Sequence, residues 1–227
     1  MILNGLRAEL EKGRKEIKIM MTVKEFQVGL VGTNCFVAVN SETKEALVID
    51  PGDQANVIID HIQKNQLHPA AVLLTHGHFD HCMAAQKLAE HYGISIYVHE
   101  DEKETMENPA YNCCGMIGKN LTFYADRYFH GEKDHLSLAG FEIDVFHTPG
   151  HTVGGVCFYV QSEGILFSGD TLFCESVGRT DFPKGSMSQL VRSIHEKLLP
   201  LPDDTKVLPG HGEWTTIGKE RRYNPFL

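Results

Sequence analysis

The chain has 227 residues, of which 42% are hydrophobic, and its formal net charge at pH 7 is −9. This length suits a single globular domain with a substantial core. It contains no run of the ~20 apolar residues that a membrane helix requires and no Lys/Arg cluster of the kind that contacts nucleic acid. We therefore expect a soluble protein that acts on small molecules, without membrane or nucleic-acid partners.

The first twenty residues alternate in charge and lack the apolar segment of a secretory signal, so we expect a cytoplasmic protein. They are either an added helix or sequence upstream of a start at Met21. Residues 1–20 are accordingly assigned as an N-terminal extension, and residues 21–227 as one domain.

Short β-rich runs alternate with helical patterns in the first half of the domain. CFVAV and ALVID are apolar and are separated by a polar turn, as in a hairpin, whereas QANVIIDHIQKN has the apolar spacing of an amphipathic helix. The predicted elements are strands at 35–39 and 46–50, a helix at 54–65, a strand at 70–75, a helix at 82–93, a strand at 94–99, an exposed acidic helix at 100–108 and an irregular segment at 110–134.

The second half continues with strands and a well-marked helix. Ser186 and Gln189 fit a capping box, which predicts a helix start near residue 187. One strand each is predicted at 136–150, 156–161 and 164–170, a further strand running into a histidine loop at 205–212, and a short helix near the end of the chain. Four strand-like runs in the whole chain end at a possible metal ligand. The ends of strands are positions at which a rigid scaffold holds functional side chains in place. These ligands are His76, His151, Asp170 and His211.

The densest group of metal-capable side chains is the stretch THGHFDH, which follows the apolar strand at 70–75. His76 and His78 leave an extended segment on the same side, while Asp80 and His81 begin the next helix and point elsewhere. Burying four such groups without a partner would be costly, so a metal site is the favoured interpretation. The six cysteines lack C-x-x-C spacing and are expected to be reduced thiols.

One short stretch can therefore supply two metals, His76 and His78 for the first and Asp80 and His81 for the second. His151 in HTPGHT, Asp170 in SGD and His211 in PGHG offer the remaining donors, and the two oxygens of Asp170 could bridge both ions. Nitrogen and oxygen donors suit zinc, with iron or manganese as alternatives. Histidines such as His99 are interpreted as ordinary, and His147, although near His151, has no matching partner.

In this order and at these separations, THGHFDH, HTPGHT, SGDTLF and PGHG resemble the metallo-β-lactamase superfamily from about Phe26 onward. The resemblance implies an α/β (α+β) fold, an αββα four-layer sandwich with a dinuclear metal site at the sheet edge. It also implies that His76, His78 and His151 bind one metal, that Asp80, His81 and His211 bind the other, and that Asp170 bridges them. Asp50 in VIDPG would not bind a metal itself but would orient one of the metal ligands.

Within that superfamily, the sequence is most similar to the glyoxalase II-like (hydroxyacylglutathione hydrolase-like) group, through VGRTDFP, LPDDTKVLPGHG and ERRYNPFL. Several β-lactamases carry a cysteine where Asp170 stands, which argues against antibiotic hydrolysis. The chain stops at Leu227, without the C-terminal helical segment of the larger glyoxalase II enzymes, which predicts a more open pocket. An iron-dependent persulfide dioxygenase and a lactonase-type hydrolase are the alternatives.

The resemblance predicts a zinc-type thioesterase for S-acylglutathione or a similar small anionic thioester. A hydroxide shared by two cations would attack the acyl carbon, with Asp80 and Asp170 as catalytic residues that also bind metal. Two divalent cations, two aspartates and a hydroxide leave the site near +1, which favours an anionic substrate. Arg179 is either a substrate contact or the ion-pair partner of Asp181.

Overall fold

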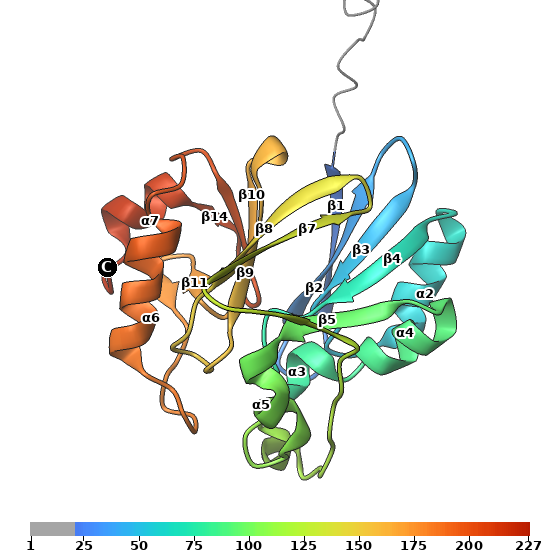
Figure 1. The fold of residues 1–227 in the computed structure, drawn as a ribbon, viewed down its shortest axis with the longest axis horizontal. Helices are drawn as coiled ribbons and strands as arrows, with labels where there is room; N and C mark the ends of the chain where they lie inside the picture. The colour runs from blue at the N-terminus through green and yellow to red at the C-terminus, as the bar shows by residue number, and fades with distance from the viewer. Residues whose placement is uncertain (1–20) are drawn as a thin grey trace, which may run out of the picture.

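The structure is a computed structural model that describes residues 21–227. The predicted N-terminal extension, residues 1–20, lies outside the described residues. Two β-sheets pack face to face, and helices cover the outer face of each sheet (Figure 1). The αββα sandwich predicted from the sequence is therefore confirmed.

The first sheet has the strand order β1-β2-β3-β4-β5-β6. Its strands are β1 (Met21–Val28), β2 (Thr33–Asn40), β3 (Glu45–Ile49), β4 (His68–Leu73), β5 (Ser95–His99) and β6 (Arg127–Phe129). The predicted hairpin is β2–β3, and β3 to β6 run parallel to one another. Parallel strands end at one edge of the sheet, so the segments that follow β3 and β4 lie together.

The second sheet has the order β14-β13-β10-β9-β8-β7. Its strands are β7 (Lys133–Leu138), β8 (Phe141–His147), β9 (Val156–Val160), β10 (Ile165–Gly169), β13 (Lys206–Pro209) and β14 (Thr215–Thr216), and β11 (Leu172–Phe173) pairs separately with β12 (Ser176–Val177). Both β8 and β10 are antiparallel to β9, and β13 is parallel to β10. Hence β8, β10 and β13 point the same way, and the loops after them meet at one edge.

Helices α2 and α4 pack against the first sheet, and α6 and α7 pack against the second. The regular ones are α2 (Ala55–Lys64), α3 (Phe79–Cys82), α4 (Ala85–Tyr92), α5 (Lys103–Glu107), α6 (Met187–Ser193) and α7 (Ile217–Tyr223), and short 3₁₀ or π turns are η1 (Glu100–Glu102), η2 (Cys114–Ile117), η3 (Gln161–Glu163) and η4 (Ile194–Leu198). The helix predicted near residue 187 begins where expected, because Ser186 Oγ accepts a hydrogen bond from the Gln189 amide. Among the described residues, no helix is both long and apolar enough to cross a membrane.

Three apolar layers separate the four structural layers. Ile58, Leu88 and Val98 belong to the layer between the first sheet and its helices, and Phe141 and Phe158 to the layer between the sheets. Leu190 and Ile194 of the α6–η4 helix pack on the outer face of the second sheet. Burial of this apolar surface stabilises the sandwich and provides the rigid base from which the edge loops project.

Three predicted elements differ from the structure. The segment 110–134, predicted to be irregular, contains η2, the short strand β6 and the start of β7. The segment 136–150 contains two strands, β7 and β8, joined by a turn at Ala139 and Gly140, both of which have positive φ. The acidic segment 100–108 is helical, but it is not exposed throughout, because Glu102 and Met106 are buried. The prediction of a fully exposed helix was wrong there.

Candidate metal centre

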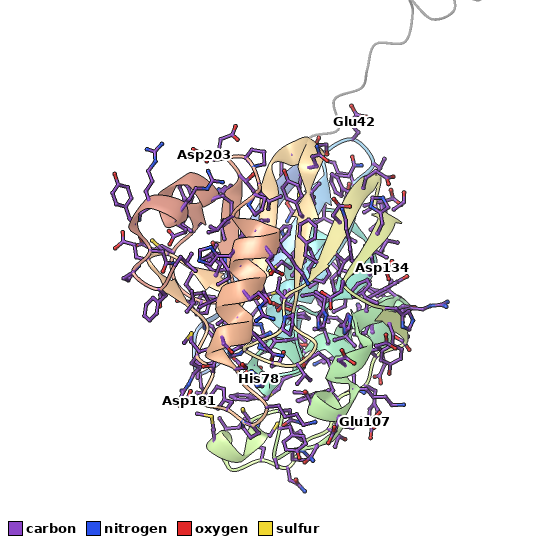
Figure 2. The ribbon with its side chains drawn as sticks, turned by 60° about the vertical axis from the view of Figure 1, so that its left-hand side comes forward. Glu42, His78, Glu107, Asp134, Asp181 and Asp203 are labelled. Carbon is purple, nitrogen blue, oxygen red and sulfur yellow. The ribbon has the colours of Figure 1, made fainter. Side chains whose placement is uncertain are left out.

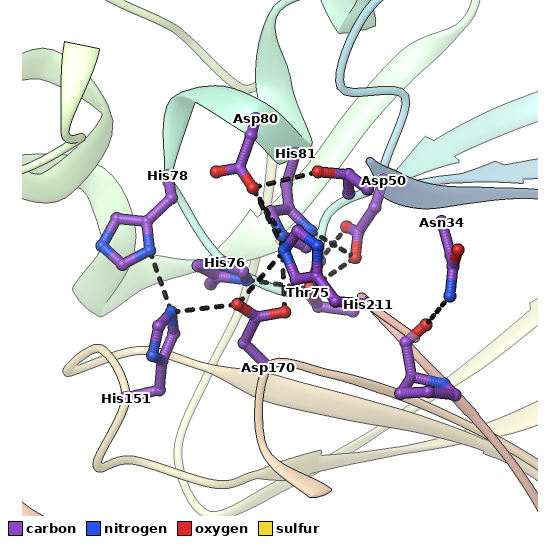
Figure 3. Close-up of polar contacts among 12 residues, drawn as sticks. Asn34, Asp50, Thr75, His76, His78, Asp80, His81, His151, Asp170 and His211 are labelled. Atoms are coloured by element: carbon purple, nitrogen blue, oxygen red, sulfur yellow. Dashed lines mark hydrogen bonds and ion pairs between the residues drawn. The ribbon is translucent and has the colours of Figure 1, made fainter. Parts of the chain in front are cut away.

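Seven side chains predicted as ligands converge at the edge of the sandwich (Figure 3). Donor atoms of His76, His78 and His151 form one group in which all atoms lie within 4.8 Å of one another. Asp80, His81 and His211 form a second such group, and Asp170 forms a third with His76 and His81. The structure thus brings together every residue of the predicted set.

The first sheet supplies four of these side chains through the segment between β4 and α4. His76 and His78 lie in the extended part, and His78 is the N-cap residue of α3. Asp80 lies in the first turn of that helix, where a carboxylate is favoured by the helix dipole. The change from extended chain to helix directs the two pairs of donors to different positions, as the spacing predicted.

The second sheet supplies the other three from loops after parallel-running strands. His151 follows β8, Asp170 follows β10 and His211 follows β13. Gly210 lies so close to Asp170 Oδ1 that a Cβ atom there would overlap it, and it would come within 2.7 Å of His81. A side chain at position 210 would therefore push the donors apart.

Asn34 of β2 fixes the loop that carries His211. Its side-chain amide donates to the carbonyl oxygens of Pro209 at 3.0 Å and Gly212 at 2.9 Å, and its backbone amide donates to Gly210 at 2.7 Å. Sequence reasoning did not identify this residue. The contact spans the two sheets, and no local pattern around Asn34 signals it.

A hydrogen-bonded chain behind the site sets the orientation of two imidazoles. Asp50 Oδ2 accepts from Thr75 Oγ1 at 2.6 Å and from His81 Nδ1 at 3.0 Å, and Thr75 Oγ1 lies 3.0 Å from His76 Nδ1. Because Thr75 donates to Asp50, it accepts from His76. The Nδ1 proton of each imidazole is therefore held by an acceptor behind the site, and each Nε2 atom faces the site, where a cation could bind it.

Three buried atoms in the site have no hydrogen-bond partner within residues 21–227. They are His76 Nε2, His81 Nε2 and Asp170 Oδ1. Buried polar atoms without partners are rare, because each loses its hydration without compensation. Since all three are electron-pair donors that face one another, a bound cation fits them, and the donor set of imidazole nitrogen and carboxylate oxygen suits zinc or iron.

Asp170 lies between the two histidine groups. Its Oδ1 is 3.5 Å from His81 Nε2, and its Oδ2 is 3.5 Å from His151 Nε2 and 3.6 Å from His211 Nε2. Asp80 Oδ2 lies 3.2 Å from His211 Nε2 and accepts a hydrogen bond from Thr33 at 3.0 Å. These positions are compatible with one carboxylate shared by two cations.

The electrostatics divide the histidines into two kinds. Burial and the neighbouring histidines lower the pKa of His76 and His78 well below the usual range, so both are neutral at pH 7. Burial opposes a charge on His81 as well, yet Asp80, Asp170 and Asp50 raise its pKa to about 10. Without a metal this imidazole is therefore protonated, and a cation bound at Nε2 would displace that proton. The carboxylates therefore attract positive charge to the place where a cation would bind, and the neutral imidazoles keep their lone pairs available.

A buried carboxylate beneath the ligand loops was missed by sequence reasoning. Glu102 is 0% exposed, and its two oxygens accept from the backbone amides of Gly77 and Gly154, each at 2.7 Å. Gly77 stands between His76 and His78, and Gly154 follows His151 by three positions. Glu102 therefore connects the two loops that carry the first histidine group.

Arg179 forms the ion pair with Asp181 that the sequence suggested as one of its two roles. Its guanidinium donates to both oxygens of Asp181, at 2.6 and 2.5 Å, and lies over the Phe182 ring at 4.2 Å from the centroid. Its backbone carbonyl accepts from His151 Nδ1 at 2.7 Å. The ion pair is thus present, and a substrate contact by Arg179 stays a prediction.

A cavity of about 400 Å³ opens onto the donor atoms. His78, Asp80, His151, Asp170 and His211 form its floor. Figure 2 shows His78 and Asp181 at the same end of the molecule, opposite Glu42 and Asp203. The candidate ligands are therefore accessible to a small molecule from one end of the sandwich.

Comparison with known proteins agrees with this geometry. Residues 28–211 match the model of the metallo-beta-lactamase superfamily. Hydroxyacylglutathione hydrolase GloC of Haemophilus influenzae is 40% identical over 209 residues, which cover 91% of this chain and 98% of that protein.

Two solved structures have the same fold over nearly the whole chain. The BLEG-1 B3 metallo-beta-lactamase is 44% identical with a TM-score of 0.87, covering 91% of this chain and 99% of that one. TTHA1623 in a di-iron-bound form is 35% identical with a TM-score of 0.80, covering 90% of this chain and 100% of that one. Together with the family match, these likenesses show that the chain belongs to the metallo-β-lactamase superfamily, as its motifs predicted.

Proposed function

We propose that the protein is a dinuclear metallo-hydrolase of glyoxalase II type, which cleaves S-acylglutathione or a similar small anionic thioester. The observation that carries the proposal is the donor set itself: two groups of three side chains with Asp170 between them. The similarity to the hydroxyacylglutathione hydrolase of H. influenzae supports the thioester as the substrate class.

When bound, a pair of divalent cations supplies Lewis acidity, which lowers the pKa of water toward neutrality and polarises a carbonyl group. The chain would hold them through His76, His78 and His151 on one side and through Asp80, His81 and His211 on the other, with Asp170 shared. Zinc fits these donors, and iron is supported by the di-iron form of TTHA1623.

The protein's own groups position the reaction and manage its proton. Asp80 lies at the cavity floor, and although its burial opposes ionisation, His81 and His211 hold its pKa well below the usual range, so it is a carboxylate. It can therefore accept a hydrogen bond from a water molecule near the acyl carbon. Burial raises the pKa of the nearby Cys113 thiol to about 11, so this side chain is not a nucleophile at neutral pH.

Alanine at Asp170 tests the proposal. We expect Asp170→Ala to bind fewer than two metal ions per chain and to lose at least about 10³-fold in turnover of S-D-lactoylglutathione, because the shared carboxylate is removed. Asp101→Ala, which changes an exposed aspartate, is the control and should retain both properties. Unchanged metal content and turnover in Asp170→Ala would refute the dinuclear mechanism.

The similarity to BLEG-1 favours β-lactam hydrolysis as a second candidate activity, although the aspartate at position 170 argued against it. Both reactions add water to a carbonyl group, so the same donors could serve either. Turnover of a chromogenic cephalosporin and of a thioester by the same zinc-loaded preparation distinguishes them. For the persulfide dioxygenase alternative, full activity would require one iron per chain and oxygen uptake.

A further inference from the structure

We propose that the cavity selects thioesters with an apolar acyl group over thioesters with a short hydroxyacyl group. The apolar acyl group is a straight hydrocarbon chain or an aromatic ring. This inference rests on the proposed thioesterase function and specifies its substrate class. It follows from the composition of the cavity wall, from the exposed side chains at the cavity mouth and from the ion pair that Arg179 forms with Asp181.

The wall of the cavity above the metal ligands is apolar. Side chains from five separate places in the chain contribute to it, namely Val31, Phe79, Met116, Ile117, Phe173 and Phe182. Most polar side chains that line the cavity are the candidate ligands, which would be committed to the metal centre, and the others are Cys113, Ser176 and Arg179. A substrate group that extends from the reacting carbonyl into the cavity therefore meets hydrocarbon, which favours an apolar group by the free energy of its transfer from water.

Two exposed apolar side chains also lie at the mouth of the cavity. Val31, in the turn between β1 and β2, is 51% exposed, and Met116 of η2 is 64% exposed. Val31 and Met116 both line the cavity although they lie 85 positions apart in the sequence. Exposed apolar residues that gather at a cavity mouth are typical of a binding surface, and methionine adapts to acyl chains of different shape.

The cavity offers little to a charged or hydroxylated acyl group. Arg179 is the only Lys or Arg among the described residues that line it, and both oxygens of Asp181 already bind its guanidinium. The face of that guanidinium lies on Phe182. A second anion would have to compete with Asp181, so we place the charged thiol part of the substrate toward solvent and the acyl part in the cavity.

A series of glutathione thioesters that differ only in the acyl group tests this inference. With metal-loaded full-length protein, we expect kcat/KM to rise about two- to fourfold per methylene from acetyl to hexanoyl. Hexanoyl should therefore exceed acetyl at least tenfold, and lactoyl should fall below butanoyl. A flat or falling series would overturn the inference alone, whereas failure to hydrolyse any thioester would overturn the proposed function as well.

Two matched variants locate the effect. Met116→Lys should lower the hexanoyl-to-acetyl ratio of kcat/KM at least about fivefold, because a charge replaces hydrocarbon at the mouth. Met187→Lys changes an exposed methionine of α6 outside the cavity and should leave the ratio unchanged. Because the ratio is taken within one preparation, partial misfolding does not affect it, and an unchanged ratio in Met116→Lys would overturn the assignment.

Discussion

Residues 21–227 contain two clusters of histidine and aspartate that proximity alone does not distinguish. In the candidate metal centre, donor atoms of His76, His78 and His151 lie within 4.8 Å of one another, and the same holds for His99, Asp101 and His147 at the ends of β5 and β8. The two clusters differ in how the imidazole rings are oriented and in what their nitrogens contact.

In the metal centre the rings stand nearly perpendicular, at 84° for His76 and His151 and 89° for His78 and His151. Perpendicular rings can direct their in-plane lone pairs toward a common point. His99 and His147 are instead stacked, with an interplanar angle of 6° and a centroid separation of 4.2 Å. Their lone pairs lie in parallel planes and cannot converge on one ion.

The nitrogens of the stacked pair already have partners. His99 Nε2 donates to the Gly131 carbonyl at 3.1 Å, and His147 Nε2 donates to the Val153 carbonyl at 2.9 Å. In the candidate metal centre, His76 Nε2 and His81 Nε2 have no hydrogen-bond partner among the described residues. Ring orientation and unsatisfied donors, more than distance, therefore distinguish a metal site from a structural contact.

The largest expected difference between the clusters is their response to metal removal. A chelator should abolish turnover and lower the Tm by about 5–15 °C, because a cation at 100 to 1,000 times its Kd contributes ~3–4 kcal/mol to folding. Differential scanning fluorimetry with and without added zinc measures this shift. The variant His147→Ala should show the same zinc-dependent shift, and loss of that shift would mean that the stacked pair also binds metal.

The next largest effect is expected at Glu102, which lies between the clusters. Glu102→Gln replaces one acceptor oxygen by a donor that faces a backbone amide, so one of the loops around His76–His78 and His151 must shift. We expect metal affinity to fall about 10- to 100-fold, as for other residues that orient ligands. Zinc titration with a competing chelator measures it.

Glu104→Gln provides the control for this variant. Glu104 is on α5 and its side chain is 63% exposed, where it pairs with Lys184. Its replacement should leave zinc affinity unchanged. Equal affinities for the two variants would show that the buried carboxylate does not position the ligands.

A smaller effect is expected from His147→Ala itself. The variant loses the stacking contact with His99 and leaves the Val153 carbonyl without its imidazole donor, so the free energy of unfolding should fall by about 1–3 kcal/mol. Urea denaturation of the zinc-saturated protein measures this, with the exposed His195→Ala as control. A change in bound zinc would contradict the purely structural role.

The smallest effect is a pH dependence of stability that arises from His99. Burial and the adjacent His147 lower the pKa of His99 below its ordinary value of 6.5. The unfolded chain therefore binds a proton more readily, and this contribution to stability is lost as the pH falls below 6.5 toward the folded pKa. Urea midpoints of the wild type and His99→Asn should diverge below pH 6.5, and parallel profiles would contradict this assignment.

The sequence predicted the strand ends and the seven candidate ligands because those signals are local. His76 to His81 lie in one short segment that directly follows an apolar strand. Glycines mark the loops around His151 and His211. The hairpin at Ala139–Gly140 was missed because a non-glycine residue adopts positive φ in a run that reads as one strand.

Features decided by distant contacts could not be predicted in this way. Glu102 lies in an acidic run that favours solvent, and its burial depends on amides 25 and 52 positions away. The parallel rings of His99 and His147 likewise depend on the packing of the two sheets. In each case the relevant interaction joins segments whose separation leaves no periodic pattern in the sequence.

The distribution of the donors over both halves of the chain also has a consequence for biosynthesis. His76 to His81 are made early, whereas Asp170 and then His211 follow only after most of the second sheet. A growing chain on the ribosome therefore holds an incomplete set of donors until β13 has emerged and paired beside β10. No partially synthesised form therefore presents the complete donor set, and a metal centre that needs all seven side chains can assemble only when the second sheet is nearly finished.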